Sequence, residues 1–374
     1  MVPSKEGLSL NLYGCKLRAC RRILTFPLII FTIFCHKMKW KTHAPTRSLR
    51  MRVLKLLTLL AALLSFSPGL QAKEFPKLPV AITSFGATCH DQAIYVYGGQ
   101  LGSAHSYSWD QVNKPLYRLR LEPGAEWEEL ASDEPALGPT LWTHERGVIR
   151  VGGMQPRNAE GEEQNLVSVP YVRIFDPESG EWSQLVDLPT PRSSHDSIIV
   201  NNKIYVVGGW QMKGKNYNSS WIKTVEILDL SAERPEWRSI EQPFLRRALS
   251  VAVVGDELFC MGGLDNGGDT SLEVDILDLE TEKWRKGPEL PEGPMDGFGI
   301  SGLVDGDDGK LYITGFSGKV HAFNGKDGWD EVAQFKHGRF FSRFVDPPGA
   351  PLIVLGGVGK EGRSQVVEQI PDGQ

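Results

Sequence analysis

Side chains suited to binding sugars gather in three stretches of this sequence. The stretches are residues 100–114 with His105, Tyr107 and Trp109, residues 154–168 with Gln155, Arg157 and Asn158, and residues 210–221 with Trp210, Gln211 and Tyr217. Aromatic rings pack on the C–H faces of sugars, and amides bind hydroxyl groups. The stretches therefore predict a ligand-binding surface. The alternative is that these side chains only pack the stretches onto the rest of the protein.

Arginine residues form a second candidate cluster. The cluster consists of Arg192, Arg246, Arg247 and Arg339, which stand shortly before segments expected to be strands. Guanidinium groups bind carboxylates in a bidentate manner, so a cluster of them would hold an anionic sugar or an acidic peptide. The alternative is that each arginine pairs with one of the many acidic residues. His195 lies beside Arg192 and is interpreted as a packed strand residue rather than a catalytic one.

Other reactive patterns are weak in this chain. The sequence has no Cys/His metal spacing, no phosphate-binding loop and no nucleophile elbow. The acidic run 305–309 is interpreted as a solvated hairpin turn. We therefore predict no metal and no cofactor, and we leave the catalytic residues unassigned.

A repeat of roughly fifty residues organises the elements that must position these side chains. Five glycine pairs and one degraded copy each follow a short apolar run: Gly98-Gly99, Gly152-Gly153, Gly208-Gly209, Gly262-Gly263, Thr314-Gly315 and Gly356-Gly357. A tryptophan follows each of the first five copies: Trp127, Trp182, Trp237, Trp284 and Trp329. In the third copy, strands are expected at 194–200, 203–207, 223–229 and 236–240, which makes four short antiparallel strands.

A strand that ends in Gly-Gly, then a Val-Glu-x-x-Asp-like strand and then a tryptophan, resembles the kelch repeat of β-propellers. The resemblance covers residues from about 75 to 374. It implies an all-β fold, a six-bladed kelch-type β-propeller. Glycine suits a place where a side chain would clash, and a tryptophan on the outer strand fills the gap between neighbouring blades.

The last repeat lacks its tryptophan and outer strand. Residues 74–80 precede the first repeat and match the Leu188-Pro189 and Leu290-Pro291 elements that follow outer strands elsewhere. We therefore expect the N-terminal strand of the mature chain to close the last blade, because closure removes exposed sheet edges.

The stretches after the glycine pairs are unequal in length. They are long in the first three repeats (100–114, 154–168 and 210–221) and short in the others (264–270, 316–318 and 358–363). Long loops on a rigid scaffold are a common place for function. We expect a raised wall on one side of the channel mouth.

The N-terminal region differs from the repeats. Residues 51–72 have the basic start, apolar core and small-residue end of a signal peptide, so an extracytoplasmic (periplasmic or secreted) location is expected. Residues 1–50 are interpreted as a gene-model extension, with a basic membrane anchor as the alternative. Residues 73–374 would form the propeller. Of the cysteines in this part, Cys89 and Cys260, both are expected to be free and buried thiols.

The net charge of residues 73–374 indicates which classes of partner are expected. Residues 1–72 hold 12 basic residues and one acidic residue, which leaves 29 basic against 45 acidic residues, a net charge of −16, from residue 73 onward. Such a domain repels phosphate backbones, so nucleic acid is not an expected partner. No stable membrane insertion is expected after the signal peptide is removed.

Three functions follow from the resemblance. The first is a kelch propeller that binds a glycan or protein ligand at its loop-rich face. The alternative is a sugar-active enzyme, because the chain is similar in plan to periplasmic sialic-acid (N-acetylneuraminate) epimerases/mutarotases, with His105 or a nearby acid moving protons. A copper oxidase related to galactose oxidase needs a Cys–Tyr crosslink and a histidine pair, and the sequence indicates neither.

Overall fold

The computed structural model describes residues 75–295 and 297–371. The chain divides into a unit of residues 1–71 and a unit of residues 72–374, and only the second contains described residues. The predicted extension 1–50 and the predicted signal peptide 51–72 lie outside the described residues and stay predictions. Within the described part, no helix is long and apolar enough to cross a membrane.

Five antiparallel sheets of four strands and one of three follow one another along the chain. The first has β1 (Gly86–His90), β2 (Ala93–Tyr97), β3 (Leu116–Arg120) and β4 (Glu128–Leu130), and the second has β5 (Thr140–His144), β6 (Gly147–Val151), β9 (Val172–Asp176) and β10 (Glu181–Gln184). The third has β11 (Asp196–Val200), β12 (Lys203–Val207), β15 (Thr224–Asp229) and β16 (Trp237–Glu241), and the fourth has β18 (Ser250–Val254), β19 (Glu257–Met261), β21 (Val274–Asp278) and β22 (Trp284–Lys286). The fifth has β23 (Ser301–Val304), β24 (Leu311–Thr314), β25 (Lys319–Phe323) and β26 (Trp329–Gln334), and the last has β27 (Arg343–Val345), β28 (Ile353–Leu355) and β31 (Val367–Gln369).

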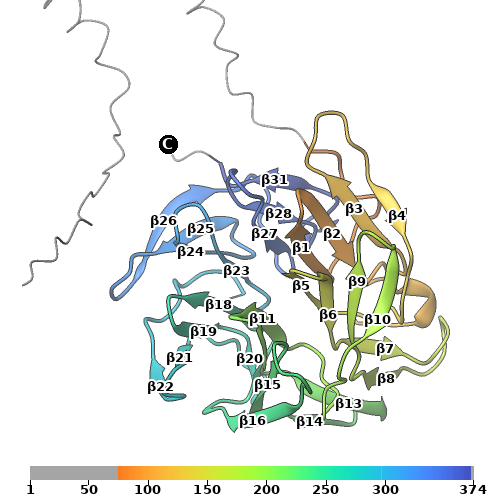
Figure 1. The fold of residues 1–374 in the computed structure, drawn as a ribbon, viewed down its shortest axis with the longest axis horizontal. Coiled ribbons are helices and arrows are strands. Elements are labelled where there is room, and N and C mark those ends of the chain that lie inside the picture. Colours follow the sequence, from red (N-terminus) through yellow and green to blue (C-terminus); the bar gives the residue numbers. More distant parts are fainter. Residues whose placement is uncertain (1–74, 296, 372–374) are drawn as a thin grey trace, which may run out of the picture. The chain divides into compact units, whose positions relative to one another are not determined.

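These sheets are arranged round a common centre, with the first strand of each innermost (Figure 1). Each inner strand contacts the inner strand of the next sheet, and β27 contacts β1. Apolar side chains of consecutive sheets form joint core clusters, as Ile204 and Val206 do with Ile149 and Val151. The all-β class and the four-stranded repeat are confirmed, including the degraded fifth copy.

The glycine pairs are the places where consecutive sheets come closest. Both members of each intact pair have a positive φ, as Gly208 (65°) and Gly209 (84°) do. The second glycine donates its N–H to a carbonyl just before the next inner strand, and Gly209 reaches Arg246 in this way at 2.8 Å. A Cβ on Gly208 would lie 2.7 Å from the Arg246 carbonyl oxygen of the next repeat. Only glycine meets both conditions.

The tryptophans fasten the outer strands to the preceding sheet. The indole N–H of Trp237 donates to the carbonyl of Val186 at 2.9 Å, and that of Trp284 donates to Glu241 at 2.9 Å. Trp182 makes the same contact with Ala131. The predicted position of these rings between neighbouring blades is therefore confirmed.

The last sheet has three strands among the described residues. The N-terminal segment lies against it, because the N–H of Leu78 donates to the Gln365 carbonyl at 2.8 Å. Trp127 donates to the Pro76 carbonyl at 3.1 Å, as the other tryptophans do to outer strands. The predicted closing strand itself is not among the described strands and stays a prediction.

The two long stretches after β6 and β12 form a separate sheet. It consists of β7 (Met154–Pro156), β8 (Asn165–Ser168), β13 (Trp210–Lys215) and β14 (Ser219–Trp221), in the order β14-β13-β8-β7. The first long stretch holds the short helix η1 (Trp109–Gln111). Smaller pairs are β17 (Arg246–Arg247) with β20 (Leu264–Asp265) and β29 (Val358–Gly359) with β30 (Gly362–Arg363).

Alanine substitutions at two glycines test the close approach of the sheets. Gly208→Ala should lower the free energy of unfolding by more than about 3 kcal/mol, because it adds a clash with the next repeat to the left-handed backbone penalty. Gly180 has a φ of 73° but open space around its Cβ position. Gly180→Ala should therefore cost only about 1 kcal/mol. Urea denaturation measures both, and equal losses would contradict the account.

Candidate functional site

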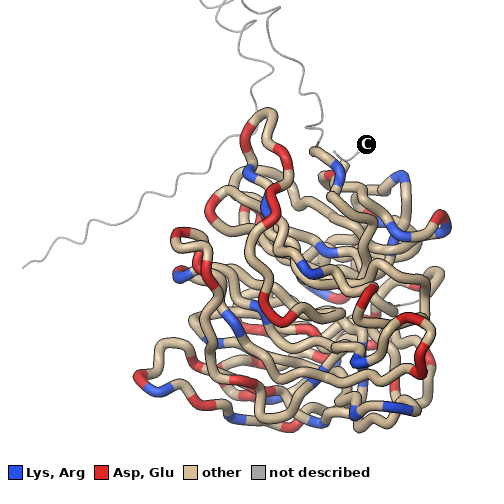
Figure 2. Tube along the Cα trace, turned by 90° about the vertical axis from the view of Figure 1, so that its right-hand side faces the viewer, with Lys and Arg blue, Asp and Glu red and all other residues tan. Residues whose placement is uncertain are grey.

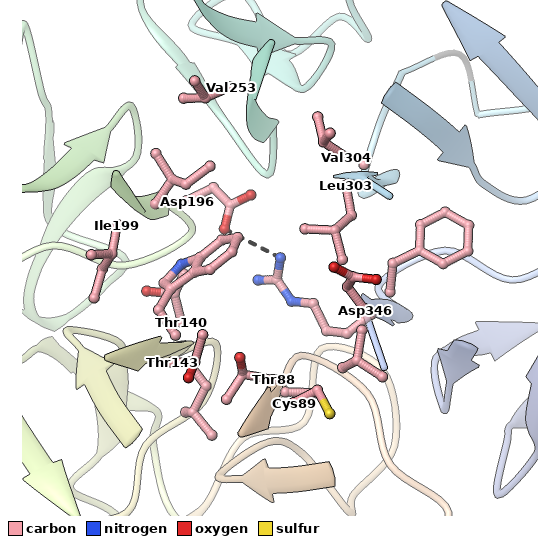
Figure 3. Close-up of a pocket in the computed structure, with 18 of the residues that line it drawn as sticks. Thr88, Cys89, Thr140, Thr143, Asp196, Ile199, Val253, Leu303, Val304 and Asp346 are labelled. Carbon is pink, nitrogen blue, oxygen red and sulfur yellow. Dashed lines mark hydrogen bonds and ion pairs between the residues drawn. The ribbon is translucent and has the colours of Figure 1, made fainter. Parts of the chain in front are cut away.

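Two cavities occupy the centre of the ring of sheets. One, of about 390 Å³, is lined by the loops after the glycine pairs and by the residues before the inner strands, and we call it the upper cavity. The other, of about 450 Å³, is lined by the inner strands themselves, and we call it the lower cavity (Figure 3). Arg343 lines both.

Equivalent residues of all six repeats build the wall of the upper cavity. Three residues before each inner strand stand Thr83, Leu137, Ser193, Arg247, Phe298 and Phe340, and all six line it. The next residue in each repeat lines it too, and in all six that residue has a positive φ, from 51° to 62°. This turn brings the chain round the cavity before it enters the inner strand. One of the six wall positions, that of Arg247, carries a charge.

The upper cavity combines aromatic rings with cations. Tyr107, Trp210, Tyr217 and Phe298 line it together with Arg247, Arg343 and Arg363. No aspartate or glutamate is among its described lining residues. In Figure 2, acidic and basic residues are interspersed along the chain. In a strongly acidic domain, this lining therefore favours an anionic ligand.

Arg247 is the most informative residue of the wall. Its guanidinium carbon lies 4.2 Å from the centre of the Trp210 ring, so the group stacks on the indole. Among the described residues, no carboxylate lies within ion-pair distance of it, and its Nε has no hydrogen-bond partner. Desolvation by burial lowers the pKa of Arg247, although the nearby Tyr107 raises it. A held, partly desolvated and unpaired guanidinium is suited to a carboxylate.

Several other buried polar atoms without a partner lie in residues of the same wall. They belong to Thr83, His195, Trp210, Ser342 and Arg363. Arg363 has one partner, because its Nη1 donates to the Gly102 carbonyl. In the lower cavity, the described lining has one such residue, Trp142. Since buried polar groups normally have partners, the upper cavity is the stronger candidate for a ligand site.

Four of the predicted site residues line the upper cavity: His105, Tyr107, Trp210 and Tyr217. His105 and Tyr217 are exposed at its rim, where Tyr217 donates its hydroxyl to Gln164 at 2.9 Å. The long stretches thus bring together the aromatic residues that the sequence singled out.

Five others lie outside the lining and hold the loops together or face solvent. Asn158 is buried, and its amide donates to the Tyr107 carbonyl at 2.8 Å, which joins the first and second stretches. Gln155 is fully buried and donates to the Pro135 carbonyl. Trp109 lies in η1, Gln211 is paired in β13, and Arg157 is exposed.

Of the predicted arginine cluster, Arg247 lines the upper cavity, whereas Arg192, Arg246 and Arg339 do not. Each of these three is buried in an ion pair with an acid of its own sheet: Glu226 at 3.1 Å, Asp275, and Glu368 at 2.5 Å. Arg192 also donates to the carbonyls of Val206 and Thr224. Desolvation lowers the pKa of Arg192 to about 10, so it stays charged at neutral pH. These arginines link strands, which was the alternative interpretation.

The arginine of the predicted cluster that lines the cavity is the immediate neighbour of one that does not. Arg246 and Arg247 form β17, and successive side chains of a strand point to opposite sides. Arg246 therefore turns into the sheet toward Asp275, and Arg247 turns to the cavity. Apart from residue type, nothing in the sequence indicated that Arg343 and Arg363 would line a cavity.

His195 and the two cysteines are packed residues without a reactive environment. His195 is buried, and desolvation lowers its pKa to about 3, so its imidazole is neutral near pH 7. Cys89 and Cys260 are both free, as predicted. Cys260 is buried and Cys89 is half-buried, and burial raises the pKa of the Cys89 thiol to about 12. Neither thiol is poised for nucleophilic chemistry.

A family model matches residues 138–336, and its description is KLHDC2/KLHL20/DRC7 Kelch-repeats domain. The chain is 27% identical over 233 residues to beta-scruin of Limulus polyphemus, covering 61% of this chain and 24% of that protein. It is 25% identical over 261 residues to Kelch repeat and BTB domain-containing protein 12 of Homo sapiens, covering 67% of this chain and 40% of that protein. The chain thus spans less than half the length of these relatives.

A solved structure described as the structure of YjhT resembles this chain with a TM-score of 0.62. The likeness covers 78% of this chain and 95% of that one at 19% identity. At this identity, the likeness concerns the fold.

Adjacent substitutions separate the two arginine roles. Arg246→Ala should lower the free energy of unfolding by about 3–5 kcal/mol, because it leaves Asp275 buried without its guanidinium partner. Arg247→Ala removes no ion pair and should cost less than about 1 kcal/mol. Urea denaturation of both variants measures the difference, and a larger loss for Arg247→Ala would show that Arg247 is the structural residue.

Proposed function

The chain belongs to the KLHDC2/KLHL20/DRC7 Kelch-repeats domain family, and from this premise we propose that it binds a small anionic sugar in the upper cavity. The observation that carries the proposal is Arg247, an unpaired guanidinium held on Trp210 in a wall without described acidic residues. The cavity volume of about 390 Å³ is in the range of small-molecule sites.

The lining supports a sugar over a simple anion. Tyr107 and Trp210 line the cavity with aromatic rings, which suit C–H groups, and the Ser194 hydroxyl and Gln100 amide oxygen suit sugar hydroxyls. The Gln100 amide nitrogen already donates to the Ser103 and Ser106 carbonyls. A sugar acid would place its carboxylate on Arg247 and its ring along the aromatic side of the cavity. A bound acidic side chain of a peptide would use the same guanidinium, which makes a protein ligand the competing occupant.

Binding assays with a sugar acid and its neutral counterpart test this proposal. N-acetylneuraminate should bind the protein, as measured by isothermal titration calorimetry, and its methyl ester should bind at least about tenfold more weakly. Arg247→Ala should reduce the affinity for the acid by about 10- to 100-fold, because a charge-assisted hydrogen bond is lost. The affinity of Arg247→Lys for the acid should lie between those of the wild type and Arg247→Ala, since lysine keeps the charge but lacks the forked donors of a guanidinium.

Two results would oppose the proposal. One is equal affinity for the acid and the ester, and the other is unchanged affinity in Arg247→Ala. Arg157→Ala serves as the matched control, because Arg157 is an exposed arginine in the second long stretch and lies outside the lining. An acidic peptide that binds while sugars do not would favour the protein ligand.

The enzymatic alternative, mutarotation of a sialic acid, concerns the same cavity. His105 lines its rim and is exposed, so it has access to water and to a bound sugar. His195 is held neutral, which makes it a poor proton donor. NMR of anomer exchange in the titrated samples decides this alternative: faster exchange that is lost in His105→Ala supports it, and no acceleration by the wild type rejects it.

We further propose that the N-terminal segment completes the last blade, and Trp127 supports this. Its indole contacts the Pro76 carbonyl as other tryptophans contact outer strands, and Gly357 donates to the Ile82 carbonyl at 2.9 Å as other second glycines do to the next repeat. Deletion of residues 75–79 should lower the unfolding midpoint of the whole domain in one transition. An unchanged midpoint would contradict this proposal.

A further inference from the structure

The first residue of each inner strand occupies an equivalent place round the channel. In chain order these residues are Gly86, Thr140, Asp196, Ser250, Ser301 and Arg343. They stand at the level where the upper cavity ends and the lower cavity begins, because Arg343 lines both. Two of the six are charged, and they belong to the third and the last sheet.

Most of these side chains tie one inner strand to the next. The Ser250 hydroxyl accepts the Gly302 N–H at 3.0 Å, and the Ser301 hydroxyl accepts the Phe344 N–H at 2.8 Å. Asp196 makes the same contact with one oxygen, which accepts the Val251 N–H at 3.0 Å. A serine is therefore sufficient for this link, and the second carboxylate oxygen of Asp196 is not needed for it.

Arg343 and Asp196 use their remaining atoms on each other. Arg343 Nη1 donates to Asp196 Oδ1 at 3.2 Å, and Arg343 Nε donates to the Phe85 carbonyl at 3.1 Å. The contact joins the last sheet to the third, and Figure 3 shows it as the dashed line at Asp196 in the middle of the ring. The pair thus crosses the channel between the two cavities.

The two partners differ in exposure. The Asp196 side chain is 3% exposed, whereas that of Arg343 is 24% exposed. Among the described residues, Arg343 Nη2 has no hydrogen-bond partner, because the contacts of this guanidinium use Nε and Nη1. A guanidinium fixed at two of its nitrogens presents the third in a defined direction.

We infer that Arg343 is a second ligand-contacting guanidinium, at the inner end of the upper cavity, and that Asp196 is the residue that positions it. The inference rests on the proposed function, since it names a further determinant of the same site. Arg247 lies in the wall and Arg343 at the floor, so the cavity recognises a ligand with anionic or strongly electronegative groups at two places. A sugar acid with a carboxylate and neighbouring hydroxyls has this character.

The energetics of buried ion pairs agree with a functional role. A buried pair is often no more stabilising than the neutral residues that could replace it. Ser250 and Ser301 show that neutral residues meet the structural need at equivalent positions. What the pair adds is a partly exposed guanidinium held in one orientation at a cavity.

A double-mutant cycle tests the inference. In isothermal titration calorimetry, Arg343→Gln should lose about tenfold in affinity for N-acetylneuraminate and about as much for its methyl ester, because Arg343 contacts a group other than the carboxylate that Arg247 holds. Asp196→Asn should lose about threefold for the acid, because the guanidinium remains but is no longer held by a charge. The double variant should equal Arg343→Gln alone, since Asp196 acts through Arg343.

Different binding results would contradict the role of Arg343 and the proposed function. If Arg247→Ala loses acid binding and a folded Arg343→Gln keeps the wild-type affinity for both the acid and the ester, Arg343 is a structural tie and this inference is wrong. Additive losses in the double variant would remove the positioning role of Asp196. If the wild type binds no sugar acid, the proposed function and this inference both fall.

A variant that keeps the positive charge replaces Arg343→Gln if that variant does not fold. Arg343→Lys is then measured, because it keeps a cation opposite Asp196 and lacks the forked donors of the guanidinium. It should reduce the affinity for both the acid and the ester by about threefold with an unchanged unfolding midpoint. Unchanged affinities in this variant would overturn the inference.

Discussion

The close approach of neighbouring sheets at the glycine pairs is the constraint on which the rest of the structure depends. Each intact pair has two residues in the left-handed region and a backbone N–H that bonds to the next repeat. This contact fixes where the next inner strand begins. Five of the six left-handed turns that form the wall of the upper cavity stand two residues after the carbonyl that accepts this N–H. The site is thus a consequence of how the sheets are joined.

Much of this architecture could be predicted from the sequence, because it repeats. The glycine pairs, apolar runs and tryptophans gave six repeats and the approximate strands, including the damaged copy at Thr314-Gly315. The three-stranded last sheet also agrees with the missing tryptophan. The pairing of the long stretches into the β14-β13-β8-β7 sheet could not be predicted, because it joins loops of different repeats whose residues show no shared period.

The site was predictable in part, and the reason is local geometry. Aromatic residues in long loops were found by type, and His105, Tyr107, Trp210 and Tyr217 do line one cavity. Arginine type could not separate the inward Arg246 from the cavity-facing Arg247, because a shift of one residue on a strand reverses the side. The proposed role of Arg343 depends on its ion pair with Asp196, which is 147 residues away in the chain. A pair between residues so far apart in sequence could not be predicted without the fold.

The account's central claim is that Arg247 receives the anionic group of a sugar in the upper cavity. A crystal structure of the protein with N-acetylneuraminate tests it most directly. The account predicts the ligand carboxylate within about 3 Å of the Arg247 guanidinium, with the sugar ring against the aromatic side of the cavity. A sugar bound outside the upper cavity, or bound there with its carboxylate turned away from Arg247, would contradict it.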